Sequence, residues 1–461
     1  MRDIVLVLAT LFYLPASLMA PAAGLLCWEW FSIMAPHQEV YGFARGQPFD
    51  FVIAAATLLG WLFSSERKRF TPDALPWVLL IWFLWMTVTT IAGPVPDIAW
   101  TYWDRVMRIL VPVFLSFVLL TNRARIHGMV WTLVIAIGFY GVKNGGYMLA
   151  GGSGVLYGPP SSMIADNNTL ALAVVMELPL VYYLWKHTRV AWLRAGLVAT
   201  IPLQIVMVIG SHSRGGVIAL GIMLGTFWLR TDRKILYGVI GAAMVAAAFA
   251  IMPDVIWERL NTLHNVQGDA SFNERVMAWM VALDCARDYF PFGAGFYTPQ
   301  VATIWHHYLP DVDFHAAHSI YFQVLGEHGY IGLAIYAFVL VLPLYNATIV
   351  VRRTRNNPDM AWAYDLADMV RVALVAFYVG AAALSLAYFD GYLVLAALTS
   401  TLRELVSPKR VTAAEQRRIA LAATRGPVAS VGVGGTRGQW PGRYPDRRRP
   451  SAYGRRSGPS T

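Results

Sequence analysis

Long runs of apolar residues, separated by short polar loops, make up most of this chain. Many of these runs approach or exceed the roughly 20 residues that a helix needs to cross the hydrocarbon core of a membrane. The pattern therefore predicts an all-α polytopic membrane protein. The predicted membrane helices cover residues 50–65, 74–93, 105–121, 128–149, 168–185, 191–210, 215–230, 235–252, 318–351, 365–388 and 389–405.

The first apolar segment, residues 4–36, is harder to divide. It begins like a signal peptide, but the apolar chain continues to Met34, so we expect an uncleaved first span. The segment is too long for one straight helix and too short for two comfortable ones. Pro15 and Pro21 favour a kinked or broken helix. One net crossing here gives about 12 transmembrane helices in all.

Basic residues cluster in the loops between these segments, and cytoplasmic loops are enriched in Lys and Arg. The clusters are Arg67–Lys68–Arg69, Arg123 with Arg125, Lys186 with Arg189, Arg230 with Arg233 and Lys234, Arg352 with Arg353 and Arg355, and the residues after Arg403. This distribution predicts that both termini are cytoplasmic. The segments predicted to lie outside are Pro36–Pro48, 94–104, 150–167, 211–214 and the long loop 253–317.

Composition supports a membrane protein and argues against a nucleic-acid partner. The chain has 461 residues, of which 57% are hydrophobic and 14% charged, whereas soluble domains carry about 25% charged residues. The net charge of +10 comes from loops between spans and from a basic tail, which is the pattern of membrane topology. We expect residues 1–405 to form the membrane domain and residues 406–461 to be a disordered cytoplasmic tail. Cys27 and Cys285 show no metal spacing, and a disulfide between them is not expected.

The long break at residues 253–317 is the first candidate for function, because long loops in compact folds usually carry it. Within it, the stretch NERVMAW has the apolar spacing of an amphipathic helix lying along the membrane surface, and it carries Arg275. The alternative role of Arg275 is an ion pair with Glu274 or Asp269. We expect this loop to be partly helical and to cover an active site.

Arg214 stands in GSHSRGG, between two predicted spans and beside two glycines that allow close backbone approach to a ligand. The alternative is an interfacial arginine that reaches toward lipid headgroups. Arginines at the membrane edge on two different segments suit a pyrophosphate, because the guanidinium fork binds phosphate oxygens in a bidentate manner.

His318 begins a predicted span in the stretch HAAHSIYFQVLGEHG. Its ordinary pKa is near 6.5, so it can act as a general base, although an interfacial histidine bonded to backbone is the alternative. His306, His307, His315 and His328 are weaker candidates. No HExxH motif or carboxylate cluster indicates a metal.

Further polar residues near the outer ends of spans are candidates for substrate binding. Each has an ordinary structural role as its alternative, in packing, topology or helix capping. These candidates are Arg105, Arg108, Lys143, Asn167, His315 and Asp390. Asn167, together with Asn168, either caps a helix or binds sugar.

Three passages together resemble the O-antigen ligase superfamily of bacterial inner-membrane glycosyltransferases. They are GSHSRGG, the stretch from NERVMAW to PFGAGF, and AHSIYFQVLGEHGYIG. The passage GVKNGGYMLAGGSGVLYGPPSSMIADNN is similar to the exosortase-associated branch of that superfamily. The resemblance covers roughly residues 1–405 and leaves the tail out.

The resemblance implies a metal-independent, inverting transfer of a glycan at the periplasmic face of the inner membrane, without a cofactor. The donor would be a glycan on undecaprenyl pyrophosphate, and the acceptor a sugar hydroxyl of lipid A–core in lipopolysaccharide biosynthesis. Arg214 and Arg275 would hold the pyrophosphate, and His318 would help to activate the acceptor.

Two alternatives stay open at this point. An O-antigen polymerase or a protein O-oligosaccharyltransferase would use the same lipid donor with another acceptor. A transporter or flippase would place charges near the middle of the membrane, whereas here they gather at the predicted outer face. The sequence does not identify the acceptor.

Overall fold

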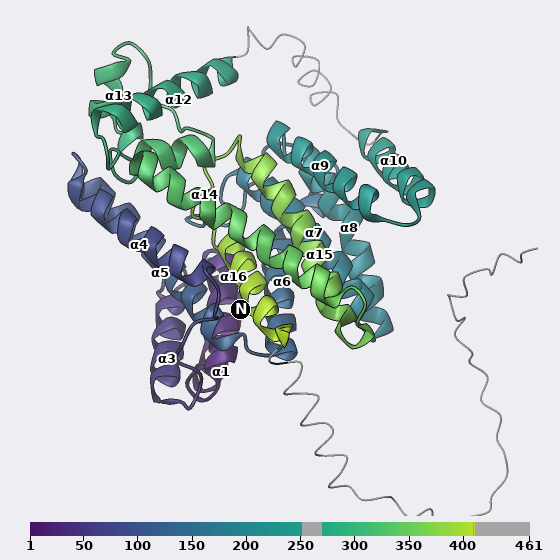
Figure 1. The fold of residues 1–461 in the computed structure, drawn as a ribbon. Coiled ribbons are helices and arrows are strands. Elements are labelled where there is room, and N and C mark those ends of the chain that lie inside the picture. Colours follow the sequence, from purple (N-terminus) through teal and green to yellow (C-terminus); the bar gives the residue numbers. More distant parts are fainter. Residues whose placement is uncertain (251–269, 409, 411–461) are drawn as a thin grey trace, which may run out of the picture. The chain divides into compact units, whose positions relative to one another are not determined.

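The computed structural model describes residues 1–250, 270–408 and 410, and this part of the chain consists of helices and loops without a strand (Figure 1). The N-terminal helices are α1 (Arg2–Met19), α2 (Pro21–Met34), η1 (Pro36–Gln38), α3 (Phe49–Phe63), α4 (Leu75–Ala92), α5 (Pro96–Leu119) and α6 (Arg123–Leu149). The central helices are α7 (Asn167–His187), α8 (Ala191–Gly210), α9 (Arg214–Arg230), α10 (Lys234–Ala250), α12 (Ala270–Asp288), η4 (Thr298–Gln300) and α13 (Ala302–Tyr308). The last are α14 (Ile320–Thr354), η5 (Pro358–Met360), α15 (Ala361–Ala381) and α16 (Asp390–Leu405).

Many described helices have the length and surface of membrane spans. Six of them, α1, α4, α6, α7, α8 and α14, are long and apolar enough to cross a membrane. Large apolar side chains such as Leu8 and Phe12 on α1 are exposed, as expected of a surface that faces lipid. An all-α membrane protein is therefore confirmed, while the expected number of about 12 spans stays a prediction.

The predicted boundaries agree closely for α7 to α10, whose ends lie within a few residues of the predicted ones. Two differences matter for the site. Helix α5 begins at Pro96, within the segment 94–104 that was predicted to be a loop, so Arg105 and Arg108 lie well inside a helix rather than at its start. Helix α15 ends at Ala381, so the segment 382–389, predicted to be mostly helical, is a loop.

The N-terminal segment is broken at Ala20, as its prolines predict, while the expected single net crossing stays a prediction. Helices α1 and α2 meet at Ala20 and form a hairpin packed on α3. The Asp3 carboxylate at the start of α1 accepts hydrogen bonds from the backbone N–H groups of Gly42 (3.0 Å) and Ala44 (3.1 Å). The start of α1 therefore lies beside the loop that follows α2.

Ion pairs join the loops that were predicted to share the cytoplasmic side. Arg67 pairs with Glu404 at 2.6 Å, and Arg125 pairs with Glu66 at 2.5 Å. A third pair joins Lys186 to Asp365 at 2.8 Å, at the junction of α7 and α15. The loops predicted to lie outside meet in a different set of contacts, described below, so the grouping of the loops agrees with the distribution of basic residues.

The interior of the described fold is built around α7 and α16. Helix α7 packs against α6, α8, α9 and α15, and α16 is buried from Asp390 to Leu402. A helix that is buried on all sides is expected to be apolar all round, so the acid that opens α16 stands out. Cys27 and Cys285 are both buried and free, as expected. Apart from residues 406–408 and 410, the tail 406–461 lies outside the described residues.

Candidate functional site

His318 lies immediately before α14, in a backbone conformation that its neighbours hold. Its φ is 43°, in the left-handed region, which costs energy for a residue other than glycine. Its N–H donates to Oγ of Ser385 at 2.9 Å, and the carbonyl of the preceding Ala317 accepts from the indole of Trp279 at 2.7 Å. The Trp279 ring stacks on Phe322, with ring centres 4.9 Å apart. Helix α12 and the loop 382–389 therefore fix the half-buried His318 from two sides.

The charges around His318 favour its neutral form. Burial lowers the pKa of His318 below its ordinary value near 6.5, and the positive charge of Arg275 on α12 lowers this pKa further. The carboxylate of Asp166, at the start of α7, acts in the opposite direction. A neutral imidazole beside an arginine is able to accept a proton at neutral pH.

Arg214 is the first residue of α9, and the turn before it is held by side chains. His212 in this turn has a left-handed φ of 61°. Oγ of Ser213 caps α9 by accepting a hydrogen bond from the N–H of Gly216 at 3.0 Å. The amide of Asn167 donates to the carbonyl of Ser211 at 2.7 Å. Asn167 therefore supports the turn that presents Arg214.

The capping role considered for Asn167 and Asn168 belongs to their neighbour Asp166. Its side chain accepts from the backbone N–H groups of Asn168 (2.9 Å) and Thr169 (3.3 Å) at the start of α7. Asp166 thus has two functions in the structure, since it caps α7 and acts electrostatically on His318. The sequence signal was present, because aspartate is among the strongest N-cap residues.

Two independent connections bring the segment of Arg214 to that of His318. At the start of α7, Asn167 holds the turn before Arg214, and the adjacent Asp166 acts on His318. On the other side, the Cβ position of Gly215 lies 3.9 Å from Cβ of Ala383, two residues before the Ser385 that bonds His318. The structure therefore gathers the segments of the three residues predicted to be catalytic, with Arg275 beside His318.

The remaining candidates separate into two groups. Lys143 pairs with Glu39 at 2.9 Å. Arg105, Arg108 and Asp390 instead line one polar cavity of about 380 Å³, which is treated below.

Among the weaker histidines, His315 lies near the carboxylate of Glu274 (3.8 Å), next to Arg275 in sequence. His306 and His307 lie on the short helix α13. In the described ranges, no group of three or more His, Cys, Asp or Glu side chains is arranged to hold a metal ion.

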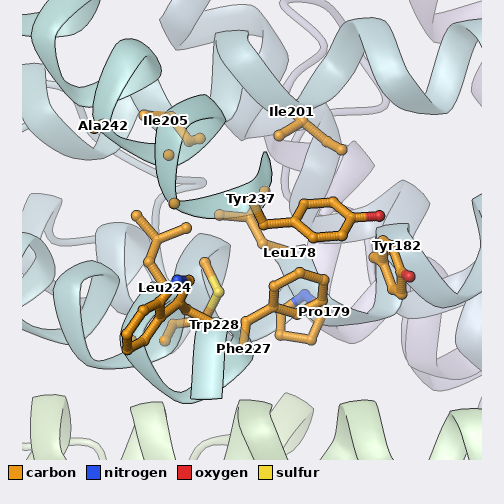
Figure 2. A pocket seen from close by; sticks show the side chains of 14 residues that line it. Leu178, Pro179, Tyr182, Ile201, Ile205, Leu224, Phe227, Trp228, Tyr237 and Ala242 are labelled. Carbon is orange, nitrogen blue, oxygen red and sulfur yellow. The ribbon is translucent and has the colours of Figure 1, made fainter. Parts of the chain in front are cut away.

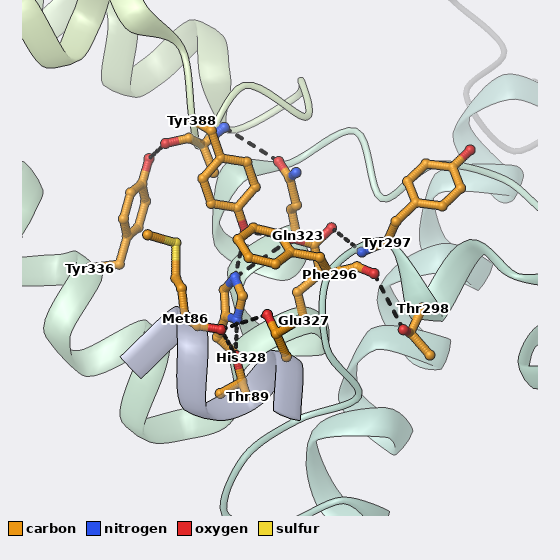
Figure 3. A network of polar contacts seen from close by, with 12 residues as sticks. Met86, Thr89, Phe296, Tyr297, Thr298, Gln323, Glu327, His328, Tyr336 and Tyr388 are labelled. Carbon is orange, nitrogen blue, oxygen red and sulfur yellow. Dashed lines mark hydrogen bonds and ion pairs between the residues drawn. The ribbon is translucent and has the colours of Figure 1, made fainter. Parts of the chain in front are cut away.

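A buried polar network around His328 was not predicted (Figure 3). The ring nitrogens of His328 are bonded to the hydroxyls of Thr89 (2.7 Å) and Tyr388 (2.8 Å). The Tyr388 hydroxyl donates to Glu327, whose other carboxylate oxygen accepts from the backbone N–H of Tyr297 at 3.2 Å. These contacts join α4, α14 and two loops, one of which is the loop that bonds His318.

The same place marks a break in α14. Gly329 adopts φ 69° and ψ −174°, which is not helical, so the carbonyls before it lose their helical partners. The backbone N–H groups of Ala294 and Gly295 donate to the carbonyls of Gly326 (2.9 Å) and Glu327 (2.8 Å), and the indole of Trp85 donates to that of His328 (2.9 Å). The stretches PFGAGF and LGEHG therefore interlock. The sequence signal for this break was an acid and a histidine that directly precede a glycine within a predicted span.

The fold and these contacts define a polytopic helical membrane protein whose site combines arginines with a neutral histidine. In comparisons with known families, residues 198–337 match the O-antigen ligase family, and residues 1–189 match a family of unknown function, DUF5935. This match confirms the predicted similarity to the O-antigen ligase superfamily over residues 198–337. Arg214, Arg275 and His318 all fall within the ligase match. No curated protein matches the chain.

This family match supports membrane glycosyl transfer of the ligase or polymerase type, with lipid-linked polysaccharide substrates in general. It does not identify the donor or the acceptor. The finer similarity to the exosortase-associated branch stays a prediction.

Proposed function

We propose that this protein is an O-antigen ligase of the bacterial inner membrane. It transfers a glycan from undecaprenyl pyrophosphate to a sugar hydroxyl of lipid A–core at the periplasmic face, in an inverting, metal-independent reaction. The observation that carries the proposal is the placement of a pKa-lowered His318 beside Arg275, with the turn of Arg214 tied to the same place through Asn167 and Asp166.

The residues have distinct roles in this reaction. His318 accepts the proton of the acceptor hydroxyl, whose oxygen forms a bond to the anomeric carbon of the donor sugar. The bond from that carbon to the phosphate oxygen breaks, and its electron pair leaves with the lipid pyrophosphate. Arg214 and Arg275 stabilise the negative charge that develops on this leaving group. The arginines supply the positive charge that a metal ion would otherwise provide.

An apolar groove fits the lipid part of the donor (Figure 2). A cavity of about 500 Å³ is lined by α7, α8, α9 and α10, with Met223, Phe227 and Trp228 from α9. Met223 and Trp228 lie nine and fourteen residues beyond Arg214, which is about 14–21 Å along a helix that rises 1.5 Å per residue. A polyprenyl chain whose pyrophosphate is bound at Arg214 would extend along α9 into this groove.

An O-antigen polymerase or a protein O-oligosaccharyltransferase is the alternative function. Both would use the same donor site, and neither the fold nor the family match distinguishes the acceptors. Deletion of the gene in the native host separates them. Loss of long chains from lipid A–core on a lipopolysaccharide gel, with lipid-linked polymer accumulating, supports the ligase. Normal attachment to lipid A–core would contradict it.

The catalytic assignment is tested with purified protein, lipid-linked donor and lipid A–core. We expect His318→Ala to reduce turnover by about two to four orders of magnitude, which is the usual contribution of a positioned acid–base group. Donor binding should persist, and EDTA should leave the wild type active. The control is His307→Ala, on α13. Near-normal transfer by His318→Ala would exclude it as the base, and EDTA inhibition reversed by a divalent ion would exclude the metal-independent reaction.

A further inference from the structure

The polar cavity that Arg105, Arg108 and Asp390 line lies at the junction of α2, α3, α5, the segment 160–163 and the start of α16. Its volume of about 380 Å³ falls in the range of about 300–1,000 Å³ found for small-ligand sites. The family of unknown function that covers residues 1–189 contributes all of its lining except Asp390. The titratable residues in the lining are His37, Asp50, Asp104, Arg105, Arg108 and Asp390.

The polar side chains of this cavity are held in place by their own contacts. The guanidinium of Arg105 donates to the carbonyl of Ser161 at 3.0 Å, which attaches the segment 160–163 to α5. Arg108 forms an ion pair with Asp104 one turn away. Asp390 is only 4% exposed, and its carboxylate accepts from the hydroxyl of Ser32 at 2.8 Å. The buried Asp390 and the contact of Arg105 therefore place polar groups on two sides of the cavity.

The charge of the lining does not fit a phosphate. Three aspartates face two arginines, and burial lowers the pKa of His37, so this histidine is neutral at pH 7. A lining without net positive charge lacks the attraction that a pyrophosphate requires. It offers carboxylate acceptors and guanidinium donors side by side, and a sugar hydroxyl both donates and accepts hydrogen bonds.

The cavity lies within reach of the proposed reaction centre through two separate segments. Met163 lines the cavity, and Asp166, which acts on His318, follows three residues later, at most about 11 Å along an extended chain. Asp390 lines the cavity, and Ser385, which bonds the N–H of His318, precedes it by five residues, at most about 18 Å. A glycan with one unit in the cavity can therefore place its next units near His318.

We propose that this cavity binds an uncharged sugar unit of one of the two glycan substrates, held by Asp50, Asp104 and Asp390 together with Arg105. The proposal rests on glycosyl transfer as the function of the protein. It assigns a binding role to the part of the chain that matches a family of unknown function. In this proposal Arg105 and Arg108 do not bind the pyrophosphate, which Arg214 and Arg275 bind instead.

The test uses the full-length protein with Asp50→Asn and Arg105→Gln, and with Asp97→Asn as the matched control. Asp97 is exposed on α5, two turns before Asp104, and does not line the cavity. Initial rates are measured with the donor varied at saturating acceptor, and then with the acceptor varied at saturating donor. We expect each cavity variant to raise the KM of the same one substrate by about tenfold or more, the effect of losing a hydrogen bond to a charged group, with kcat within about twofold. The substrate whose KM rises identifies the source of the sugar.

Inorganic pyrophosphate distinguishes a sugar site from a phosphate site. Pyrophosphate should inhibit the wild type and both cavity variants equally, because it binds at Arg214 and Arg275. Loss of this inhibition in the cavity variants would overturn the proposal, as would unchanged KM values for both substrates in variants that elute and melt like the wild type. If Arg105→Gln does not fold, Asp50→Asn decides the test. A wild type that transfers no glycan would instead contradict the proposed function itself.

Discussion

Single side chains decide the chemistry of this site through their charge and through the backbone that presents them. His212 and His318 both adopt left-handed φ values, of 61° and 43°. Such conformations in residues other than glycine often occur at functional sites, where surrounding contacts hold them. At His318 those contacts are hydrogen bonds from its own N–H and to the carbonyl of Ala317. The sequence identified His318 as a candidate but could not predict these supports, which come from residues distant in the chain.

Arginine at position 214 is expected to be irreplaceable by lysine. Arg214→Lys keeps the charge but replaces a bidentate fork with a point charge, so we expect kcat/KM to fall by about tenfold to a hundredfold. Arg275→Ala should mainly raise the KM of the donor. The control is Arg287→Lys, because Arg287 is exposed on α12 and pairs with Asp284. Normal rates in both site variants at wild-type expression would place the pyrophosphate elsewhere.

The pH dependence of the reaction should report the charges around His318. The base must be neutral, and its pKa is lowered, so activity should be lost only as the pH falls below 6.5. Arg275→Gln removes a charge that lowers this pKa, and the acidic limb should move to higher pH. Asp166→Asn keeps an N-cap residue but removes a charge that raises the pKa, and the limb should move to lower pH. The measurement is the pH profile of kcat/KM for both variants. If the acidic limb moves in the same direction in both variants, or does not move, the role of His318 as the base is contradicted.

At the scale of elements, periodic apolar runs predicted the helices well, while their interruptions were missed. The ends of α8 agree with the sequence prediction because basic loops and polar turns mark them. The end of α15 was predicted too late, because residues 382–389 are nearly as apolar as the helix. These residues form a loop that is held by contacts with α14, such as the hydrogen bond from Tyr388 to Glu327. Hydrophobicity reports burial in membrane or protein, and it does not distinguish a buried loop from a helix.

The break in α14 provides a test of this interlocked region. A Cβ at Gly329 would lie 2.5 Å from the carbonyl oxygen of Pro291, and the residue has a positive φ. We expect Gly329→Ala to destabilise the protein by at least about 1–3 kcal/mol and to lower its melting temperature. The control is Gly221→Ala within α9, where a Cβ meets open space. Equal melting temperatures for the two variants would show that the break tolerates a side chain.

For the whole molecule, the sequence gives the positions of the candidate site residues along the chain but not their grouping in space. Asp390 and Arg105 are separated by hundreds of residues, and only the packing of α16 between α2 and α5 brings them to one cavity. Lys143 was predicted to be near them from its position at the end of a span, but it pairs with Glu39, which follows η1, and does not line this cavity. The positions of charges along helices could be read from the sequence, whereas the neighbours of each helix could not.

Cysteine labelling from outside intact spheroplasts tests the predicted orientation. Cysteines at Gln47 and Gln267 should react with an impermeant reagent, whereas cysteines at Asn356 and Ser457 should be protected until the membrane is opened. The native Cys27 and Cys285 are buried and should give little background. Equal reactivity of the cysteines at positions 47 and 356 would contradict the prediction that these loops lie on opposite sides of the membrane. Reaction at positions 356 and 457, with protection at 47 and 267, would show that the orientation is opposite to the predicted one.

The contacts of the first residues limit how this protein can be purified and imaged. Asp3 is bound by the backbone of Gly42 and Ala44, and the guanidinium of Arg2 lies over the ring of Tyr41 at 5.5 Å. The same loop contributes His37 to the polar cavity lined by Arg105 and Asp390. An affinity tag or a fluorescent protein fused before Met1 would begin only two residues from these contacts, so we expect a fusion placed after the C-terminal residue to give the more active preparation.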